Sequence, residues 1–157
     1  MAGYNCTRAG FTPTATNNMV LQAPAAGNYC RVTKFSWGGE LGTSTPARTR
    51  WVRATVLGTT FTNLNPTTGN PESGNVQSVA RCTCGTFGTI ATIPASPEGL
   101  FSISWNKNGG GGIFSMTQSD EEWDVINGIT PGQQLVVAQD TDTSNNSMSC
   151  SLHWKEN

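Results

Sequence analysis

The chain has 157 residues and a formal charge of −1, and only 12% of its residues are charged, against about a quarter in an ordinary soluble domain. Nine basic residues against ten acidic ones create no field that gathers phosphates, which argues against a general nucleic-acid binder. The sequence has no basic start followed by an apolar run and no stretch of about eighteen apolar residues, so we expect no membrane span and synthesis in a cytoplasm.

Short uncharged residues dominate the composition, with Thr 22, Gly 18, Asn 14 and Ser 13. Such residues disfavour helices and suit strands and turns. A chain of this length buries roughly two-thirds of its unfolded surface, which is enough for one core. We therefore expect one domain over 1–157 that needs no disulfide or metal to fold. Within it, residues 1–24 form either an extended N-terminal arm on a neighbour or a loosely packed first strand.

Period-two alternation predicts the strands of the first two-thirds of the chain. Segment 28–37 has apolar residues on both faces, which fits a strand that is covered at one end on each face, or a strand that bends as it passes from one sheet to another. In 49–57 the set that starts at Arg50 and continues through Val52 is the more apolar one, so we expect it to face inward. Segments 76–87 and 100–106 alternate in the same way, and the glycine run 109–112 joins the latter to 113–116 as a predicted hairpin.

The C-terminal third holds the clearest pattern. Segments 134–139 and 147–154 flank a polar loop, and the second of them places four apolar residues on one face: Met148, Cys150, Leu152 and Trp154. Segment 119–128 fits a two-turn helix with a capping box, or a strand that ends in an Asn-Gly hairpin, and the strand is preferred. The whole pattern predicts an all-β, single-domain antiparallel β-sandwich, jelly-roll-like, with eight to ten short strands and at most one short helix.

Catalytic and metal signatures are weak. The only histidine, His153, lies on the polar side of the last predicted strand, and no hydrolase, zinc-protease or P-loop motif occurs. Cys82 and Cys84 are one residue apart, so a strand points both thiols the same way, a spacing poorer for zinc than C-x-x-C. Residues 140–145 begin like a calcium loop, but Gly at its sixth position and Glu at its twelfth are missing. We expect buried reduced thiols, no metal, no cofactor and no enzyme.

The candidate binding residues form the only basic cluster of the sequence: Arg48, Arg50, Trp51 and Arg53. Arginine is favoured at interfaces because its planar group makes paired hydrogen bonds and stacks on rings. An ordinary solvated strand edge is the alternative interpretation. A second hypothesis is a sugar-stacking platform made from the five tryptophans, three of which alternate onto expected core faces: Trp37, Trp51, Trp105, Trp123 and Trp154.

Four stretches carry a resemblance to a known class of protein. They are A-P-A-A-G-N-Y-C-R-V-T-K-F-S-W-G-G-E at 23–40, R-x-R-W-V-R at 48–53, N-L-N-P at 63–66 and L-H-W-K-E at 152–156. In these motifs and in its layout the chain resembles the small all-β capsid decoration, or cement, proteins of tailed bacteriophages. The resemblance implies a β-sandwich, often a jelly roll, that docks on the outer face of a shell, and it carries over no functional residue.

From this resemblance we expect a structural virion protein on the capsid surface, made in the host cytoplasm. Its partner would be the major capsid protein, whose contacts it stabilises, and a homo-oligomer is expected, with a trimer favoured. A net charge near zero also removes the repulsion that keeps monomers apart. Neither nucleic acid nor membrane is an expected partner. The alternative function is a carbohydrate-binding β-sandwich module of a phage tail or surface protein.

Overall fold

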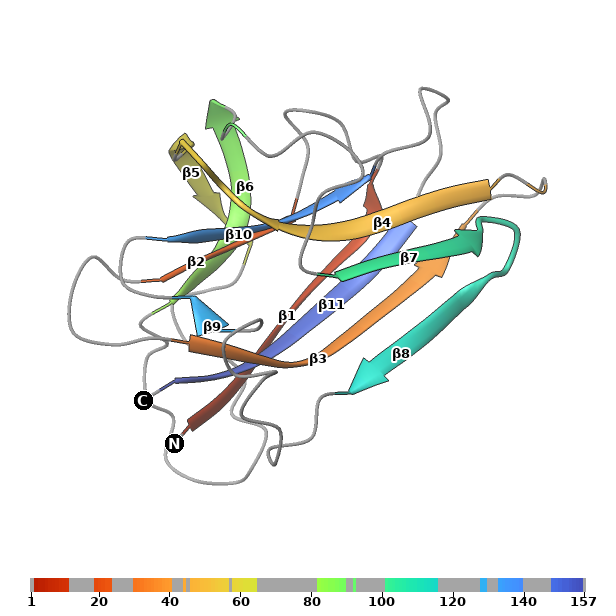
Figure 1. Ribbon diagram of the computed structural model, residues 1–157, viewed down its shortest axis with the longest axis horizontal. Helices are drawn as coiled ribbons and strands as arrows, with labels where there is room; N and C mark the ends of the chain where they lie inside the picture. Colours follow the sequence, from red (N-terminus) through yellow and green to blue (C-terminus); the bar gives the residue numbers. More distant parts are fainter. Residues whose placement is uncertain are drawn as a thin grey trace.

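The computed structural model describes residues 2–11, 19–23, 30–40, 44, 46–56, 58–64, 82–89, 92, 101–115, 128–129, 133–139 and 148–156. These residues form eleven strands and no helix (Figure 1). The strands are β1 (Ala2–Phe11), β2 (Met19–Gln22), β3 (Cys30–Gly39), β4 (Pro46–Arg53), β5 (Thr59–Asn63), β6 (Thr83–Thr89), β7 (Phe101–Asn106), β8 (Gly111–Ser115), β9 (Gly128–Ile129), β10 (Gln134–Gln139) and β11 (Met148–Glu156). In the described part of the chain, no helix could therefore cross a bilayer.

The strands form two antiparallel sheets, which confirms the predicted all-β sandwich. A five-stranded sheet has the order β1-β11-β3-β8, with β9 also paired to β3, and a six-stranded sheet has the order β5-β6-β2-β10-β4-β7. Eight of the strands pair in a nested order: β1 with β11, β2 with β10, β3 with β8 and β4 with β7. This is the topology of a jelly roll. The β5–β6 hairpin and β9 are additions to it, which raise the strand count above the eight to ten expected.

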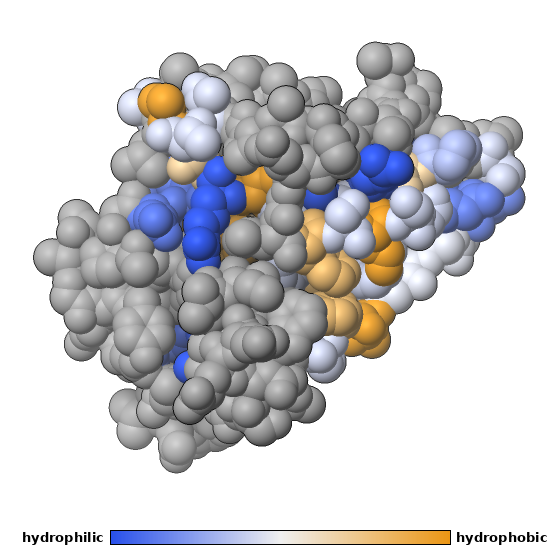
Figure 2. All heavy atoms as spheres, viewed as in Figure 1, coloured by the Kyte–Doolittle hydropathy of each residue, from blue (hydrophilic) through white to orange (hydrophobic). Residues whose placement is uncertain are grey.

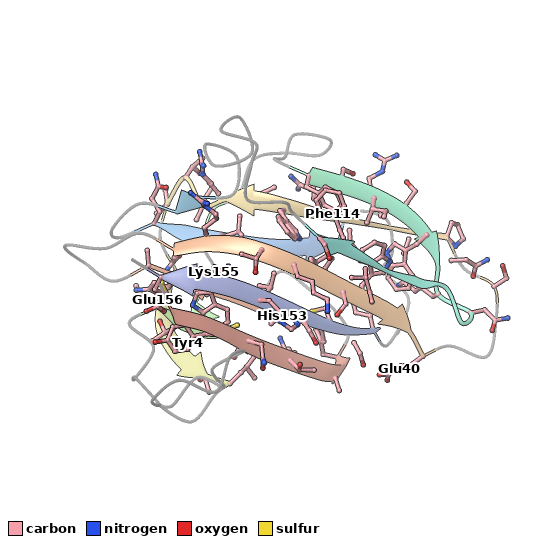
Figure 3. The ribbon with its side chains drawn as sticks, turned by 90° about the horizontal axis from the view of Figure 1, so that it is seen from below. Tyr4, Glu40, Phe114, His153, Lys155 and Glu156 are labelled. Carbon is pink, nitrogen blue, oxygen red and sulfur yellow. The ribbon has the colours of Figure 1, made fainter. Side chains whose placement is uncertain are left out.

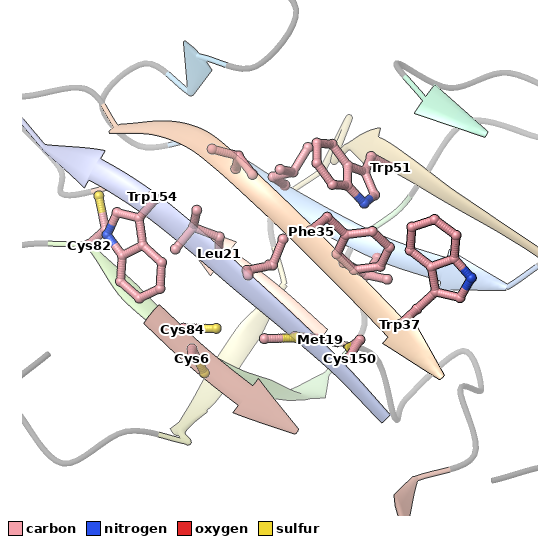
Figure 4. Close-up of a cluster of buried hydrophobic side chains, with 14 of the residues drawn as sticks. Cys6, Met19, Leu21, Phe35, Trp37, Trp51, Cys82, Cys84, Cys150 and Trp154 are labelled. Atoms are coloured by element: carbon pink, nitrogen blue, oxygen red, sulfur yellow. Dashed lines mark hydrogen bonds between the residues drawn. The ribbon is translucent and has the colours of Figure 1, made fainter. Parts of the chain in front are cut away.

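The core lies between the two sheets, and β11 shows why this sequence forms it. Successive side chains of a strand point to opposite faces, and the burial of β11 alternates over all nine residues. Its four apolar residues are each at most 2% exposed, which confirms the predicted inward face. They pack with residues of both sheets, among them Leu21 and Phe35 (Figure 4).

The N-terminal segment belongs to the sandwich. β1 pairs with β11 from Ala2, opposite Glu156, to Phe11, opposite Met148. β2 lies inside the six-stranded sheet between β6 and β10. The described residues of 1–24 therefore include two strands of the sandwich.

β3 does not cross between sheets, although its sequence has apolar residues on both faces. Its register against β11 shifts between His153, opposite Lys34, and Trp154, opposite Val32. This β-bulge leaves Thr33 as an extra residue, and its hydroxyl donates to the His153 carbonyl oxygen at 3.3 Å. Because a bulge moves the alternation by one residue, Val32 and Phe35 both reach the core, and both are fully buried.

β4 is buried on both faces, so the expectation that its Val52 side faces the main core is wrong. Trp51 packs in the main core, with its ring centroid 5.1 Å from that of Phe35. Val52 lies on the opposite face, in a second buried cluster with three residues of β2 and β10: Val20, Val136 and Ala138. An apolar set of alternate residues identifies a buried face, but it does not distinguish which of two buried faces is the core.

Glu156 connects the two sheets from inside. Its side chain is only 6% exposed. Its Oε1 accepts a hydrogen bond from Trp154 Nε1 at 2.9 Å and another from the backbone N–H of Cys82 at 2.9 Å. Cys82 immediately precedes β6 of the other sheet. Buried donors need such partners, since a buried N–H without one costs about 1–3 kcal/mol.

Candidate functional site

β7 and β8 are the edge strands on one side of the sandwich, where both sheets end (Figure 1). The predicted hairpin over 100–116 is wrong, because these strands pair with different partners: β7 with β4 and β8 with β3. The turn after β7 carries the chain from one sheet to the other. Gly109 in this turn has a φ of 64°, a conformation that favours glycine. We call the pair of strands Phe101–Asn106 and Gly111–Ser115 the β7–β8 edge.

The centre of the β7–β8 edge is apolar and only partly covered. Four half-buried apolar residues pack against the core from it: Phe101, Ile103, Trp105 and Phe114. Ile113 is next to Phe114 on β8 but points to the opposite face of the strand, and it is 66% exposed. Figure 2 shows hydrophobic residues gathered right of centre on the face that it views. Apolar side chains that are only partly covered are a feature of interaction surfaces.

The rings of the edge are held in place by the core. Phe101 has its ring centroid 5.2 Å from Trp51 and 4.6 Å from Phe114, so it bridges the two sheets. The indole N–H of Trp105 donates to Thr49 Oγ1 at 2.9 Å. Aromatic side chains that are already fixed lose little freedom on binding, which makes them effective anchors of an interface.

Polar side chains of the two edge strands face away from these apolar residues. Ser102, Ser104 and Asn106 of β7 and Ser115 of β8 are exposed and alternate with the apolar residues, so they point to the opposite face of each strand. Arg48 lies opposite Ser104 on β4 and is half-buried. The outer faces of both edge strands are therefore mainly polar, apart from the exposed Ile113.

The two edge strands also lack the features that block edge-to-edge pairing. Native proteins protect an exposed edge with charged residues, proline or bulges. Neither FSISWN nor GGIFS contains a charge or a proline, and no register shift is found in their ladders. Within the described ranges each strand has one paired neighbour.

The predicted cluster around Trp51 does not form a surface. Trp51 is fully buried in the core, and Arg50 is only 4% exposed on the other face of the six-stranded sheet. Arg48 and Arg53 are half-buried. Of the four candidates, only Arg48 lies beside the β7–β8 edge, through its pairing with Ser104. Trp51 and Arg50 lie in the interior because β4 is covered on both faces.

The other candidates fall at separate places. Four cysteines, at positions 6, 82, 84 and 150, are buried free thiols, and Cys150 Sγ donates to Met19 Sδ at 3.1 Å. Burial raises the pKa of Cys150 far above its ordinary value, and the nearby Cys6 thiol raises it further. In the part of the chain that the structure describes, no group of three or more His, Cys, Asp or Glu side chains fits a metal ion. Trp123, segment 119–127 and residues 140–145 lie outside the described residues.

The tryptophans do not form an exposed row in the described part of the chain. Trp37, Trp51 and Trp154 are at most 8% exposed, and Trp105 is half-buried in the β7–β8 edge. His153 faces the outside of the five-stranded sheet, with Lys34 and Asn5 opposite it on the neighbouring strands. Neither arrangement resembles a sugar platform or a nucleophile with its base.

The comparisons with known proteins give no relative: no family model, no curated protein and no solved structure matches the chain significantly. Sequence reasoning missed the β7–β8 edge because it treated the alternation in 100–106 as a sign of full burial. Neither strand carries the charge or proline that is typical of an edge, so the sequence contained no signal for one.

Proposed function

We propose that this chain is a non-enzymatic structural protein of a virion, which binds the outer surface of a tailed-phage capsid and stabilises contacts between major capsid proteins. The observation that carries the proposal is the β7–β8 edge, an apolar, aromatic and uncharged pair of edge strands with Ile113 exposed. The jelly-roll topology supports it, since this architecture is common in viral capsid proteins, although one fold serves many functions. The choice of a tailed phage and its shell as the setting rests on the resemblance of the motifs and layout to those of capsid decoration proteins.

The proposed mechanism is additive. Each copy contributes a modest apolar contact through its edge, and many copies repeat this contact around a shell. Because the chain binds the assembled state and not the free subunits, it shifts the equilibrium toward assembly by mass action. The edge also offers a surface for association of copies of this chain, and we propose a homo-oligomer, with a trimer favoured. No cofactor, metal, nucleic acid or membrane takes part.

The test is binding of the purified chain to expanded capsids that lack it. We expect saturable binding in fixed ratio to the major capsid protein, and a higher temperature of capsid disruption with the chain bound. Chain added to unexpanded shells is the control for adhesion to any protein surface. Capsids that neither bind the chain nor gain stability would refute the proposal.

The alternative is a carbohydrate-binding module of a phage tail or surface protein. Half-buried Trp105, on β7 of this edge, is the observation that favours it. Sugar rings stack on exposed aromatic faces, and three other tryptophans are buried away from such a role. A glycan array distinguishes the two proposals, because a decoration protein should bind no glycan on it.

A further inference from the structure

The turn between β7 and β8 presents an asparagine that is followed by a glycine. Residues 107–109 form the turn, and Asn108 and Gly109 are both exposed. Figure 3 shows this turn at the right of the molecule, where the chain passes from β7 to β8. Exposed turns are the parts of a chain that are most accessible to solvent, so this pair of residues is open to water.

The fold requires the glycine of this pair. Gly109 has a φ of 64°, a left-handed conformation that costs other residues roughly 1–2 kcal/mol. It has no Cβ, and no atom lies within 4 Å of the place where one would be. The backbone nitrogen of Gly109 is therefore shielded neither by a side chain of its own residue nor by atoms packed on that side.

Asn108 differs from Asn106, two residues earlier, in how its side chain is held. Asn106 is also exposed, but its Nδ2 donates to Ser44 Oγ at 2.6 Å, and its Oδ1 accepts the backbone N–H of Asn108 at 2.9 Å. Within the described residues, no hydrogen bond holds the side-chain amide of Asn108. Asn106 is followed by Lys107, whose Cβ shields the next nitrogen. Of the two amides, only that of Asn108 is free to turn toward the nitrogen that follows it.

We propose that Asn108 is a site of spontaneous deamidation through a cyclic imide. Asparagine is among the thermally labile residues. The backbone nitrogen of Gly109 attacks the side-chain carbonyl carbon, Cγ, of Asn108. A bond forms between these two atoms, the Cγ–Nδ2 bond breaks, and the amide nitrogen leaves as ammonia with the proton of the Gly109 nitrogen. Water then opens the imide at either carbonyl carbon and gives aspartate or isoaspartate at this position. The reaction consumes only water, so it needs no partner and does not rest on the proposed function.

Either product changes the charge at one end of the β7–β8 edge. The chain has a net charge of −1, and conversion makes it one unit more negative. The new carboxylate lies between two strands that contain no charged residue. Charged side chains are a feature by which proteins protect edge strands from pairing, so a converted copy carries a protection that the synthesised chain lacks.

The isoaspartate product also has a longer main chain, because its backbone runs through the side-chain carbon and gains a methylene group. The turn is fixed on both sides of Asn108. Before it, the backbone of Lys107 packs so closely on Gly39 that a Cβ there would overlap the Lys107 oxygen. After it, the Gly110 carbonyl accepts the N–H of Gly39 at 2.9 Å. A longer chain between these two contacts strains them, so we expect the isoaspartate form to unfold more easily than the aspartate form.

The test incubates the intact purified chain at neutral pH and physiological temperature for several days, and digests samples from the start and the end. Trypsin cleaves after Lys107, so Asn106 and Asn108 fall in different peptides, 82–107 and 108–155. Tandem mass spectrometry locates each amide that has become an acid, and electron-based fragmentation distinguishes isoaspartate from aspartate. We expect conversion at Asn108 to be at least about tenfold faster than at Asn106, which is the matched internal control.

Three variants test the chemistry of the pair. Asn108→Gln has a longer side chain that closes a ring more slowly, so its acidic form should build up more slowly on ion exchange. Gly109→Ala places a Cβ beside the attacking nitrogen, where the space is open, and should slow conversion at Asn108. Asn108→Asp supplies the aspartate form directly. In a urea titration followed by tryptophan fluorescence, the isoaspartate fraction of the aged chain should unfold at a lower midpoint than Asn108→Asp.

Several results would overturn this proposal. They are an intact amide at Asn108 after incubation of the folded chain, conversion at Asn106 as fast as at Asn108, or conversion only in the presence of urea. Equal conversion in Gly109→Ala would show that the nitrogen of residue 109 is not the attacking atom. An isoaspartate form as stable as Asn108→Asp would contradict the strain expected in the turn.

The capsid experiment separates this proposal from the proposed function. A chain that converts at Asn108 but binds no capsid refutes the proposed function alone. A chain that binds capsids and keeps its Asn108 amide refutes the deamidation site alone.

Discussion

Replacing Ile113 by serine should weaken association through the β7–β8 edge and leave the fold unchanged. Ile113 is 66% exposed, so its removal from the isolated chain costs little. Burying a whole isoleucine side chain stabilises by roughly 1.5–3 kcal/mol, and about two-thirds of this one remains to be buried by a partner. The loss on binding is therefore about 1–2 kcal/mol for each copy, or about five- to thirty-fold in affinity.

Three measurements check this prediction. Sedimentation velocity over a concentration series gives self-association, and co-sedimentation with expanded capsids gives shell binding, while urea unfolding followed by tryptophan fluorescence gives the stability. The matched control is Val56→Ser, which removes a side chain that is 60% exposed away from the edge. The reasoning is refuted if the serine variant of Ile113 associates like the parent, or if both variants lose association equally.

Four further predictions concern the fold. Glu156→Leu should lower the free energy of unfolding by about 2–4 kcal/mol, because two buried donors lose their acceptor. Glu156→Gln keeps an acceptor oxygen, so its free energy of unfolding should fall less. Urea titration compares the two variants. Gly39→Ala should lower the thermal midpoint, since its Cβ would overlap the backbone of Lys107, whereas Gly38→Ala meets open space and should change it little. Cys150 should resist iodoacetamide in the native chain and react once unfolded, as judged by mass spectrometry. Because burial raises its pKa, the folded chain keeps a proton that the unfolded chain loses, so stability should fall as the pH rises above 9.0, the ordinary thiol value. Equal losses in either matched pair, or alkylation of native Cys150, would contradict these predictions.

The sequence predicts a strand well when its own residues determine its packing, and poorly when a distant strand does. β11 was correctly predicted because its nine residues alternate without interruption and one face packs against one core. β3 was misread because the shift of alternation at Thr33 depends on its register against a strand more than a hundred residues away. A bulge has no strong sequence signal, so apolar residues on both faces of 28–37 fit a strand covered at one end on each face, or a bend, and do not indicate the bulge.

The candidate site depended even more on distant pairing. Nothing in residues 101–115 shows that the two strands join different sheets, because a short glycine-rich turn fits a hairpin equally well. The prediction that the arginines around Trp51 bind a partner rested on their side-chain chemistry alone. Their burial follows from a second covered face of the six-stranded sheet, which depends on Val20, Val136 and Ala138 from other parts of the chain.

The position of β11 between β1 and β3 has a consequence for biosynthesis. β1 leaves the ribosome first among the described strands, yet its paired neighbour, β11, is made about 140 residues later. At roughly 5–20 residues per second, β1 waits on the order of ten seconds or more with its hydrogen-bonding groups unpaired. β3 can pair with β8 earlier in synthesis, but its other neighbour, β11, is also the last strand to be made. The five-stranded sheet therefore closes only after synthesis has passed β11, and shortening the chain from its C-terminal side removes the strand that joins the two halves of this sheet.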